Sequence, residues 1–406
     1  MPRSVLTGAK QHQRFQELLQ GYQIPTLALE KVLDAEDVSP LFNVPACVLI
    51  AGKEAQAGKV TMSVLGGTLP TKNVKWSEAK EQLELTHKQL PPDKLFPPAV
   101  SPSPYLKQMK EGATLVPRCL WFVQTVPSPY GINRERPALE TNPEVEKVAK
   151  KPWQNIHLQG EVEAQYLYAT MTSRHLLPFG ITSLSLVVLP LEDSPTGIRL
   201  VKKEAALAKG HSCLHGWLSQ AEALWKERRK ERSPVDVYSR LDYQRLLTSQ
   251  HPTGYFTVLY SRMGTNLACA VMSSAAIPGV MGLAVTGFVT EWTSYFFQAK
   301  NEAEAHYLCA FLNSNHVDQA IKPYQTRGTW GERDISRTPF EVVAIPRFNP
   351  EDEKHQKLAE LSKECHQKVA KLSLKGKSIG FLRNKVREYL KEKLAEIDEL
   401  VKDVLS

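Results

Sequence analysis

The chain has 406 residues, enough for two or three domains with buried cores. Its 42% hydrophobic and 23% charged residues form an ordinary globular mixture, which excludes a wholly disordered chain. The formal net charge of +8 is compatible with a phosphate-bearing partner such as nucleic acid.

Nothing in the sequence indicates a membrane or a secretory route. No apolar stretch approaches the roughly 18 residues that a transmembrane helix needs, and the first residues do not form a signal peptide. The six cysteines include no CxxC pair, which favours reduced thiols. We therefore expect a cytoplasmic protein with no membrane partner. His211, Cys213 and His215 in HSCLH lack the second half of a zinc site, so we predict no metal.

The amino-terminal stretch predicts a small α/β unit. We expect a helix over Ala9–Leu19 and strands over Ile24–Leu29, Val44–Ala51 and Val60–Leu65. The apolar run Val44–Ala51 is long enough for a strand that is buried on both faces in a parallel sheet. A helix with so few strands leaves sheet edges unpaired, so the unit needs a partner sheet.

The middle of the chain is rich in predicted strands. The segment Pro91–Pro104 holds six prolines in fourteen residues and reads as a linker or surface loop. Leu115–Val126 follows as a strand, with Trp121 and Phe122 in the core. Further strands are expected over Gln165–Thr170, His175–Ile181, Leu184–Leu191, Ile198–Val201, Tyr255–Met263, Asn266–Met272 and Thr286–Gln298.

One long helix is expected within this region, over Glu204–Arg229. It ends in the run Lys226–Arg232, where five of seven residues are basic. This run is either a solvated helix end whose cations complement the helix dipole or a contact with a DNA backbone through Arg228 and Arg229.

The stretch from Asn301 to Pro350 is the most patterned part of the chain. Its apolar spacing predicts a helix that stops at Asn313-Ser314, a short second helix over Val317–Ile321, and a strand over Phe340–Ile345. Between them lies a loop with two glycines and four cations, Lys322, Arg327, Arg333 and Arg337. These cations either face DNA or serve solubility and pair with nearby acidic residues.

After Pro350 two apolar stripes at steps of three and four residues predict two long helices. The first runs from Leu358 to Leu372 and the second from Ile379 to Val401, with a connection near Lys375–Lys377. We expect them to pair antiparallel as a helical hairpin.

Three of these stretches carry a family resemblance: MPRSVL at the start, FNVPACVLIAGK at residues 42–53, and the block Asn301–Pro350. Together they resemble the C-terminal part of an N-6 adenine DNA methyltransferase of restriction-modification systems, with a target-recognition domain similar to the Taq-type C-terminal specificity domain. The resemblance implies a mixed α/β fold in three parts: residues 1–60 as the end of a Rossmann-like catalytic core, 61–350 as the target-recognition domain, and 351–406 as the helical hairpin.

The sequence departs from this family in its chemistry. Pro91-Pro92 and Pro97-Pro98 are not preceded by the Asn or Asp of an NPPY-type motif, and Gly66-Gly67 stands in no glycine-rich cofactor motif. We therefore assign no catalytic residue and expect no methyl transfer by this chain alone. The resemblance implies S-adenosylmethionine for the complete enzyme, and no cofactor for this chain by itself.

The resemblance implies double-stranded DNA as a partner, together with an upstream methyltransferase core fragment or subunit. Two alternatives stay open: a non-catalytic DNA specificity subunit that acts with a separate methyltransferase chain, and a helical scaffold without a nucleic-acid partner. The candidate DNA-binding residues are Lys322, Arg327, Arg333, Arg337, Arg262, Arg228 and Arg229.

Overall fold

The computed structural model describes residues 1–6, 12, 14–15, 28–41, 45–53, 60–90, 101–129, 131–195, 197–229, 234–325, 333–374 and 378–406. The greater parts of the predicted helix Ala9–Leu19, of the strand Ile24–Leu29 and of the proline-rich segment Pro91–Pro104 lie outside the described residues, as does the connection Lys375–Lys377. Within the described part the fold is mixed α/β with several sheets and a helical C-terminal region, as the sequence predicts.

The amino-terminal unit is a four-stranded sheet of order β2-β1-β3-β4. Strands β1 and β3 are parallel and the other two pairings are antiparallel. The prediction that Val44–Ala51 forms a strand buried on both faces is wrong, because β2 is an edge strand whose Val48 and Ile50 are 52% and 49% exposed. The elements of this unit are η1 (Arg3–Leu6), β1 (Ala28–Ser39), β2 (Cys47–Gly52), β3 (Val60–Thr68), α2 (Trp76–Ala79) and β4 (Leu83–Leu90).

A five-stranded antiparallel sheet of order β8-β7-β6-β12-β9 forms the core of the middle region. The β-branched and aromatic residues of these short strands fill it, and Trp121 and Phe122 are buried in it as predicted. The strands are β6 (Phe122–Thr125), β7 (Ala138–Thr141), β8 (Gln159–Glu161), β9 (Leu167–Thr170) and β12 (Ser185–Val188).

The helix predicted over Glu204–Arg229 is two helices, α4 (Lys203–Ala208) and α5 (Ser212–Arg228). Gly210 breaks it with φ at +78°, a left-handed conformation that favours glycine. Trp217 and Leu218 bury one face of α5 against the five-stranded sheet. The smaller elements of this region are α3 (Pro143–Lys147), α6 (Val237–Leu241), β10 (Leu176–Leu177), β11 (Gly180–Ile181), β13 (Leu191–Ser194) and β14 (Gly197–Leu200).

A second antiparallel sheet has the order β17-β15-β18-β5. The strands predicted over Tyr255–Met263 and Asn266–Met272 are present as β15 (Phe256–Ser261) and β17 (Cys269–Ser273), which pair antiparallel, and β18 (Ser294–Ala299) pairs with the other edge of β15. The aromatic side chains of β18 are buried. Strand β5 (Lys110–Glu111) completes the sheet. Short 3-10 turns are η4 (Leu106–Gln108), η5 (Arg118–Leu120), η6 (Ala164–Tyr166), η7 (Ser173–His175), η8 (Tyr243–Arg245), η9 (Ser274–Ala276) and η10 (Lys322–Tyr324).

The helices predicted in the Asn301–Pro350 stretch are α7 (Glu302–Asn313) and α8 (Asn315–Ile321). The strand predicted over Phe340–Ile345 is wrong, because Thr338–Val342 forms helix α9 with Pro339 in its first turn. Proline at this position already has the φ of a helix and has no N–H to leave unpaired. Phe340 is buried in the same core as α7.

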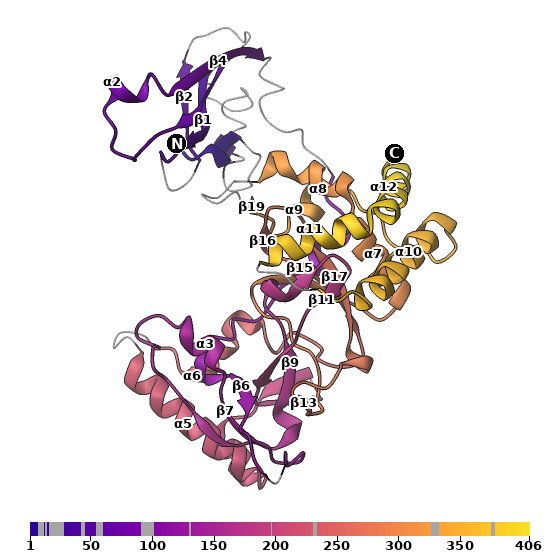
Figure 1. The fold of residues 1–406 in the computed structure, drawn as a ribbon. Coiled ribbons are helices and arrows are strands. Elements are labelled where there is room, and N and C mark those ends of the chain that lie inside the picture. Colours follow the sequence, from indigo (N-terminus) through magenta and orange to yellow (C-terminus); the bar gives the residue numbers. More distant parts are fainter. Residues whose placement is uncertain are drawn as a thin grey trace.

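Where two helices were predicted, the described residues of the C-terminal region form three: α10 (Glu353–Ala370), α11 (Ile379–Tyr389) and α12 (Lys391–Leu405). The second apolar stripe breaks at Leu390, so that α11 packs on β10 while α12 packs on α10, α7 and α8. Figure 1 shows the amino-terminal sheet at the top, the helices α7–α12 around the second sheet in the middle, and the five-stranded sheet with α5 at the bottom.

Candidate nucleic-acid interface

The predicted DNA-reading loop is fixed to the second sheet where it re-enters the described part of the chain. Strand β19 (Arg333–Asp334) pairs antiparallel with β16 (Met263–Gly264), which directly follows β15. The N–H groups of Ile335 and Ser336 both donate to the carbonyl of Arg262, at 2.8 and 3.2 Å. The residues that follow the loop are therefore held to the second sheet by backbone hydrogen bonds.

A buried tyrosine adds to this anchor. The Tyr260 hydroxyl donates to the carbonyl of Ser336 at 2.7 Å, and the Tyr260 side chain is fully buried. Burial raises the pKa of Tyr260 well above its ordinary value, so the hydroxyl keeps its proton and stays a donor. The backbone at Ser336, which follows the loop, is therefore held in a defined position on the second sheet.

The other end of the loop follows helices α7 and α8, which are tied to the edge of the second sheet. Strand β17 is the edge strand of this sheet in the described part of the chain, and three alternate backbone N–H groups at and before it donate to side chains of α8, α7 and α10. These bonds run from Leu267 N to Asp318 Oδ1 (2.7 Å), from Cys269 N to Asn313 Oδ1 (3.0 Å) and from Val271 N to His366 Nε2 (3.0 Å).

The cations predicted on the loop differ in what they can contact. Arg337 is exposed at the start of α9 and forms no ion pair with another described residue. Lys322 pairs with the buried Asp318, with Nζ–Oδ2 at 2.9 Å. The backbone of Arg333 lies in β19, its side chain is outside the described part, and Arg327 lies outside it altogether. Arg337 therefore faces solvent, whereas Lys322 compensates the charge of a buried carboxylate.

The cations predicted away from the loop have intramolecular partners. Arg262 pairs with Glu111 and lies over the ring of Trp292, 5.6 Å from its centroid. On α5, Arg228 pairs with Glu227 at 2.9 Å, and Arg229 donates to the carbonyl of Val235 at 3.4 Å. The α5 end belongs to the lower lobe in Figure 1, whereas Arg262 lies beside the loop.

Two arginines of α11 lie at the loop's base and were missed by the sequence analysis. Arg383 donates to the carbonyls of Leu176 and Ser173, at 3.0 and 2.8 Å, and Arg387 donates to the carbonyl of Leu267. Burial lowers the pKa of Arg383 to about 10. Their spacing of four residues on a helix was the available signal, since it puts both on one face.

The residues of the HSCLH segment are used in hydrogen bonds instead of a metal site. His211 Nδ1 is 2.6 Å from the Tyr166 hydroxyl, and His215 Nδ1 is 3.0 Å from the carbonyl of Lys203. In the described part of the chain, no three His, Cys, Asp or Glu side chains are grouped so that they could hold a metal ion. The described helices also include none that is both long and apolar enough for a membrane span.

The described residues do not fit S-adenosylmethionine at the one glycine pair of the amino-terminal sheet. Gly67 has φ at +144°, and a Cβ atom there would lie 2.2 Å from the carbonyl oxygen of Gln82. The glycine is therefore required by packing within the sheet, between β3 and the segment before β4. It does not form a cradle for a cofactor.

The chain resembles known proteins in its fold and not in its sequence. No family model matches the chain, and no curated protein matches it. Among solved structures, the type IIL restriction-modification enzyme MmeI in complex with DNA is similar with a TM-score of 0.57 and 9% identity, over 99% of this chain and 46% of that chain. The type IIG restriction endonuclease BpuSI aligns at 14% identity over 100% of this chain and 46% of its own, with a TM-score of 0.32. The chain therefore spans less than half the length of either enzyme, and it shares the fold of part of a restriction-modification enzyme.

Proposed function

We propose that this chain is the DNA-binding, sequence-recognising portion of a site-specific adenine-N-6 DNA methyltransferase of a restriction-modification system. The observation that carries the proposal is the cationic loop after Lys322, which leaves helix α8 and returns to a ladder on the second sheet with Arg337 turned to solvent. The fold likeness to MmeI supports the same class of protein.

The chemistry of adenine methylation explains why such a portion is needed. The adenine amino group is inaccessible inside a duplex, so the base must be flipped out of the stack before it can react. A second lobe that holds the duplex and contacts base edges can position the methyltransferase core at one DNA sequence. Arginine is suited to this reading because its two parallel N–H groups match the O6 and N7 acceptors of guanine.

The proposal assigns methyl transfer to a methyltransferase core that acts together with this chain. S-adenosylmethionine would be held by that core, because the described residues offer no cofactor cradle at Gly67. A tritiated-methyl assay with the purified chain and mixed duplex DNA should give no incorporation above a control without protein. Incorporation would contradict this part of the proposal.

The loop is tested by replacing its arginines one at a time in the complex of this chain with its methyltransferase core. The variants are Arg337→Ala, Arg327→Ala and Arg333→Ala. If the replaced arginine contacts a base, we expect a loss of about 1–3 kcal/mol in binding free energy on the cognate duplex and relaxed specificity at one position. A phosphate contact would weaken all duplexes alike and make the salt slope shallower by about one.

Arg134→Ala is the matched control, since Arg134 is an exposed arginine of the middle region outside the loop. Affinity is measured on cognate and scrambled duplexes at several salt concentrations. The loop proposal fails when all three loop variants match the parent protein on both duplexes.

A further inference from the structure

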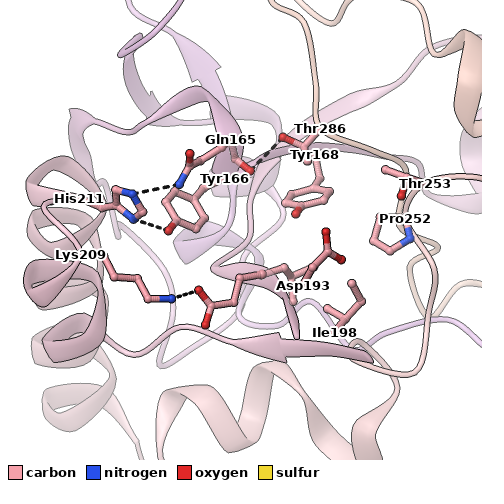
Figure 2. Close-up of a pocket in the computed structure, with 12 residues that line it drawn as sticks. Gln165, Tyr166, Tyr168, Asp193, Ile198, Lys209, His211, Pro252, Thr253 and Thr286 are labelled. Carbon is pink, nitrogen blue, oxygen red and sulfur yellow. Dashed lines mark hydrogen bonds and ion pairs between the residues drawn. The ribbon is translucent and has the colours of Figure 1, made fainter. Parts of the chain in front are cut away.

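A pocket of about 260 Å³ opens in the middle region, apart from the loop. Four chain segments far apart in sequence surround it: η6 with β9, the β13–β14 hairpin, the break between α4 and α5, and the residues around Pro252 and Thr286. Its volume lies just below the range of about 300–1,000 Å³ typical of ligand pockets, so it accommodates a single small ring system. Figure 2 shows the polar side chains arranged around one open space.

The floor of the pocket contains a tyrosine hydroxyl without a hydrogen-bond partner among the described residues. Tyr168 is only 5% exposed, and its hydroxyl has no hydrogen bond with any described residue. In Figure 2 this hydroxyl points into the open space. Burial raises the pKa of Tyr168, so the group is a neutral O–H that can donate and accept. Because the ring is buried while the hydroxyl reaches the open space, a ligand in the pocket can form hydrogen bonds with it.

Most of the other polar groups at the rim already have partners. His211 uses both ring nitrogens, with Tyr166 Oη 2.6 Å from Nδ1 and Gln165 Nε2 3.2 Å from Nε2. Lys209 pairs with Glu192, which also pairs with Arg199 at 2.6 Å, so these charges are matched within the protein.

Asp193 is the charged rim group that stays open. It is exposed, forms no ion pair with another described residue, and lies near enough to Tyr168 to raise the pKa of that phenol. Figure 2 shows its carboxylate and the Tyr168 hydroxyl turned toward the same space. A carboxylate only accepts hydrogen bonds, whereas the hydroxyl also donates one.

We propose that this pocket binds a nucleobase with an exocyclic amino group, adenine or cytosine, outside a base stack. The apolar walls, Leu191, Ile198 and Pro252 with the Tyr168 ring, suit a flat ring that would otherwise contact water. Asp193 accepts a hydrogen bond from the amino group, and the Tyr168 hydroxyl donates to the adjacent ring nitrogen. Thymine has no exocyclic amino group and presents a carbonyl oxygen at the corresponding position, which the carboxylate repels.

The same ring can come from two sources, an extrahelical base of a DNA duplex or a free nucleoside. That the ring comes from DNA rests on the proposed function, whereas the binding of the ring in the pocket does not depend on that function. The test titrates the full chain by calorimetry with deoxyadenosine, deoxycytidine and thymidine. It also uses duplexes that carry one extrahelical adenine or thymine, with a fully paired duplex for comparison.

We expect adenine and cytosine to bind more tightly than thymine. Tyr168→Phe removes only the hydroxyl and should weaken adenine binding about three- to tenfold, as the loss of one hydrogen bond does. Asp193→Asn, whose amide can donate, should abolish the discrimination against thymine. Tyr243→Phe is the matched control, since Tyr243 is an exposed tyrosine outside the pocket, and circular dichroism checks that each variant is folded.

The outcomes separate the pocket from the DNA proposal. Binding of an extrahelical adenine that depends on Tyr168 identifies DNA as the source, and binding of free nucleosides alone identifies the free source. Absence of both, or binding that neither substitution changes, overturns the pocket proposal. Salt-dependent binding of the paired duplex without base selectivity leaves the DNA-binding function standing alone, whereas nucleoside binding without any duplex binding overturns that function and supports the pocket.

Discussion

The Asn313 side chain forms hydrogen bonds with both backbone groups of Cys269, as a neighbouring strand would. The Asn313 side-chain oxygen accepts from the Cys269 N–H at 3.0 Å, and its amide nitrogen donates to the Cys269 carbonyl at 2.9 Å. One side chain at the end of α7 thus satisfies both backbone groups of one residue at the edge of the second sheet. These two bonds connect helix α7, which precedes the loop, to strand β17 of the second sheet. The loop ends at strand β19, which pairs with β16.

Replacing Asn313 should therefore unpair buried backbone. Asn313→Ala leaves the Cys269 N–H without this partner, whereas the Cys269 carbonyl keeps the Phe179 N–H at 2.7 Å. We expect a loss of about 1–3 kcal/mol in the free energy of unfolding. Asn315→Ala, two residues on and exposed, should change it by less than about 0.5 kcal/mol. Urea denaturation of both variants gives the two values, and equal losses would contradict the edge role.

Lys322 should behave as a structural cation. Asp318 is buried, accepts from the Leu267 N–H at 2.7 Å and pairs with Lys322. Lys322→Ala removes the compensating charge, and we expect a loss of about 1–3 kcal/mol in the free energy of unfolding. In the double variant Lys322→Ala/Asp318→Asn, the amide oxygen still accepts from Leu267 and no buried charge is left alone. Thermal or urea unfolding should show part of the stability restored. A single variant as stable as the parent, with weaker DNA binding, would instead place Lys322 on the DNA.

His306 should make the fold sensitive to acid. Burial, and next the nearby His366, lower the pKa of His306 to about 3 from its ordinary value of 6.5. The folded protein holds the neutral imidazole, while the unfolded chain takes up a proton below about pH 6.5. Stability is therefore lost as the pH falls from about 6.5 toward 3, at up to about 1.4 kcal/mol per pH unit for this group.

The variant His306→Gln isolates this contribution, because glutamine can still bond Ser362 but does not titrate in this range. Free energies of unfolding are measured at pH 7 and pH 5 for both proteins. The difference between the two pH values should be smaller in the variant. An unchanged difference would mean that other groups cause the acid sensitivity.

Local patterns in the sequence predicted the parts of the fold that depend on local spacing. Helices α7 and α8 and the β15–β17 hairpin follow from residue periodicity alone, as does the burial of Trp121. The error at Phe340 has a local cause, because the alternation of the segment outweighed the helix-start signal of Pro339.

The parts that sequence could not provide depend on contacts between distant residues. Asn313 reads as a helix stop, and its bond to a strand 44 residues away is invisible until the two elements are packed. The pairing of Lys322 with Asp318 at four residues' distance was accessible from helix geometry. The pocket at Tyr168 was not, since its walls come from segments between residues 165 and 286 that share no motif.

The central claim is that this chain recognises a DNA sequence, and selection from a randomised duplex pool tests it most directly. The chain is incubated with the pool at low and at physiological salt, and the retained duplexes are sequenced. We expect one enriched consensus, weaker retention at higher salt, and a position in the consensus that relaxes in Arg327→Ala, Arg333→Ala or Arg337→Ala. A retained pool as random as the input at both salt concentrations would contradict it.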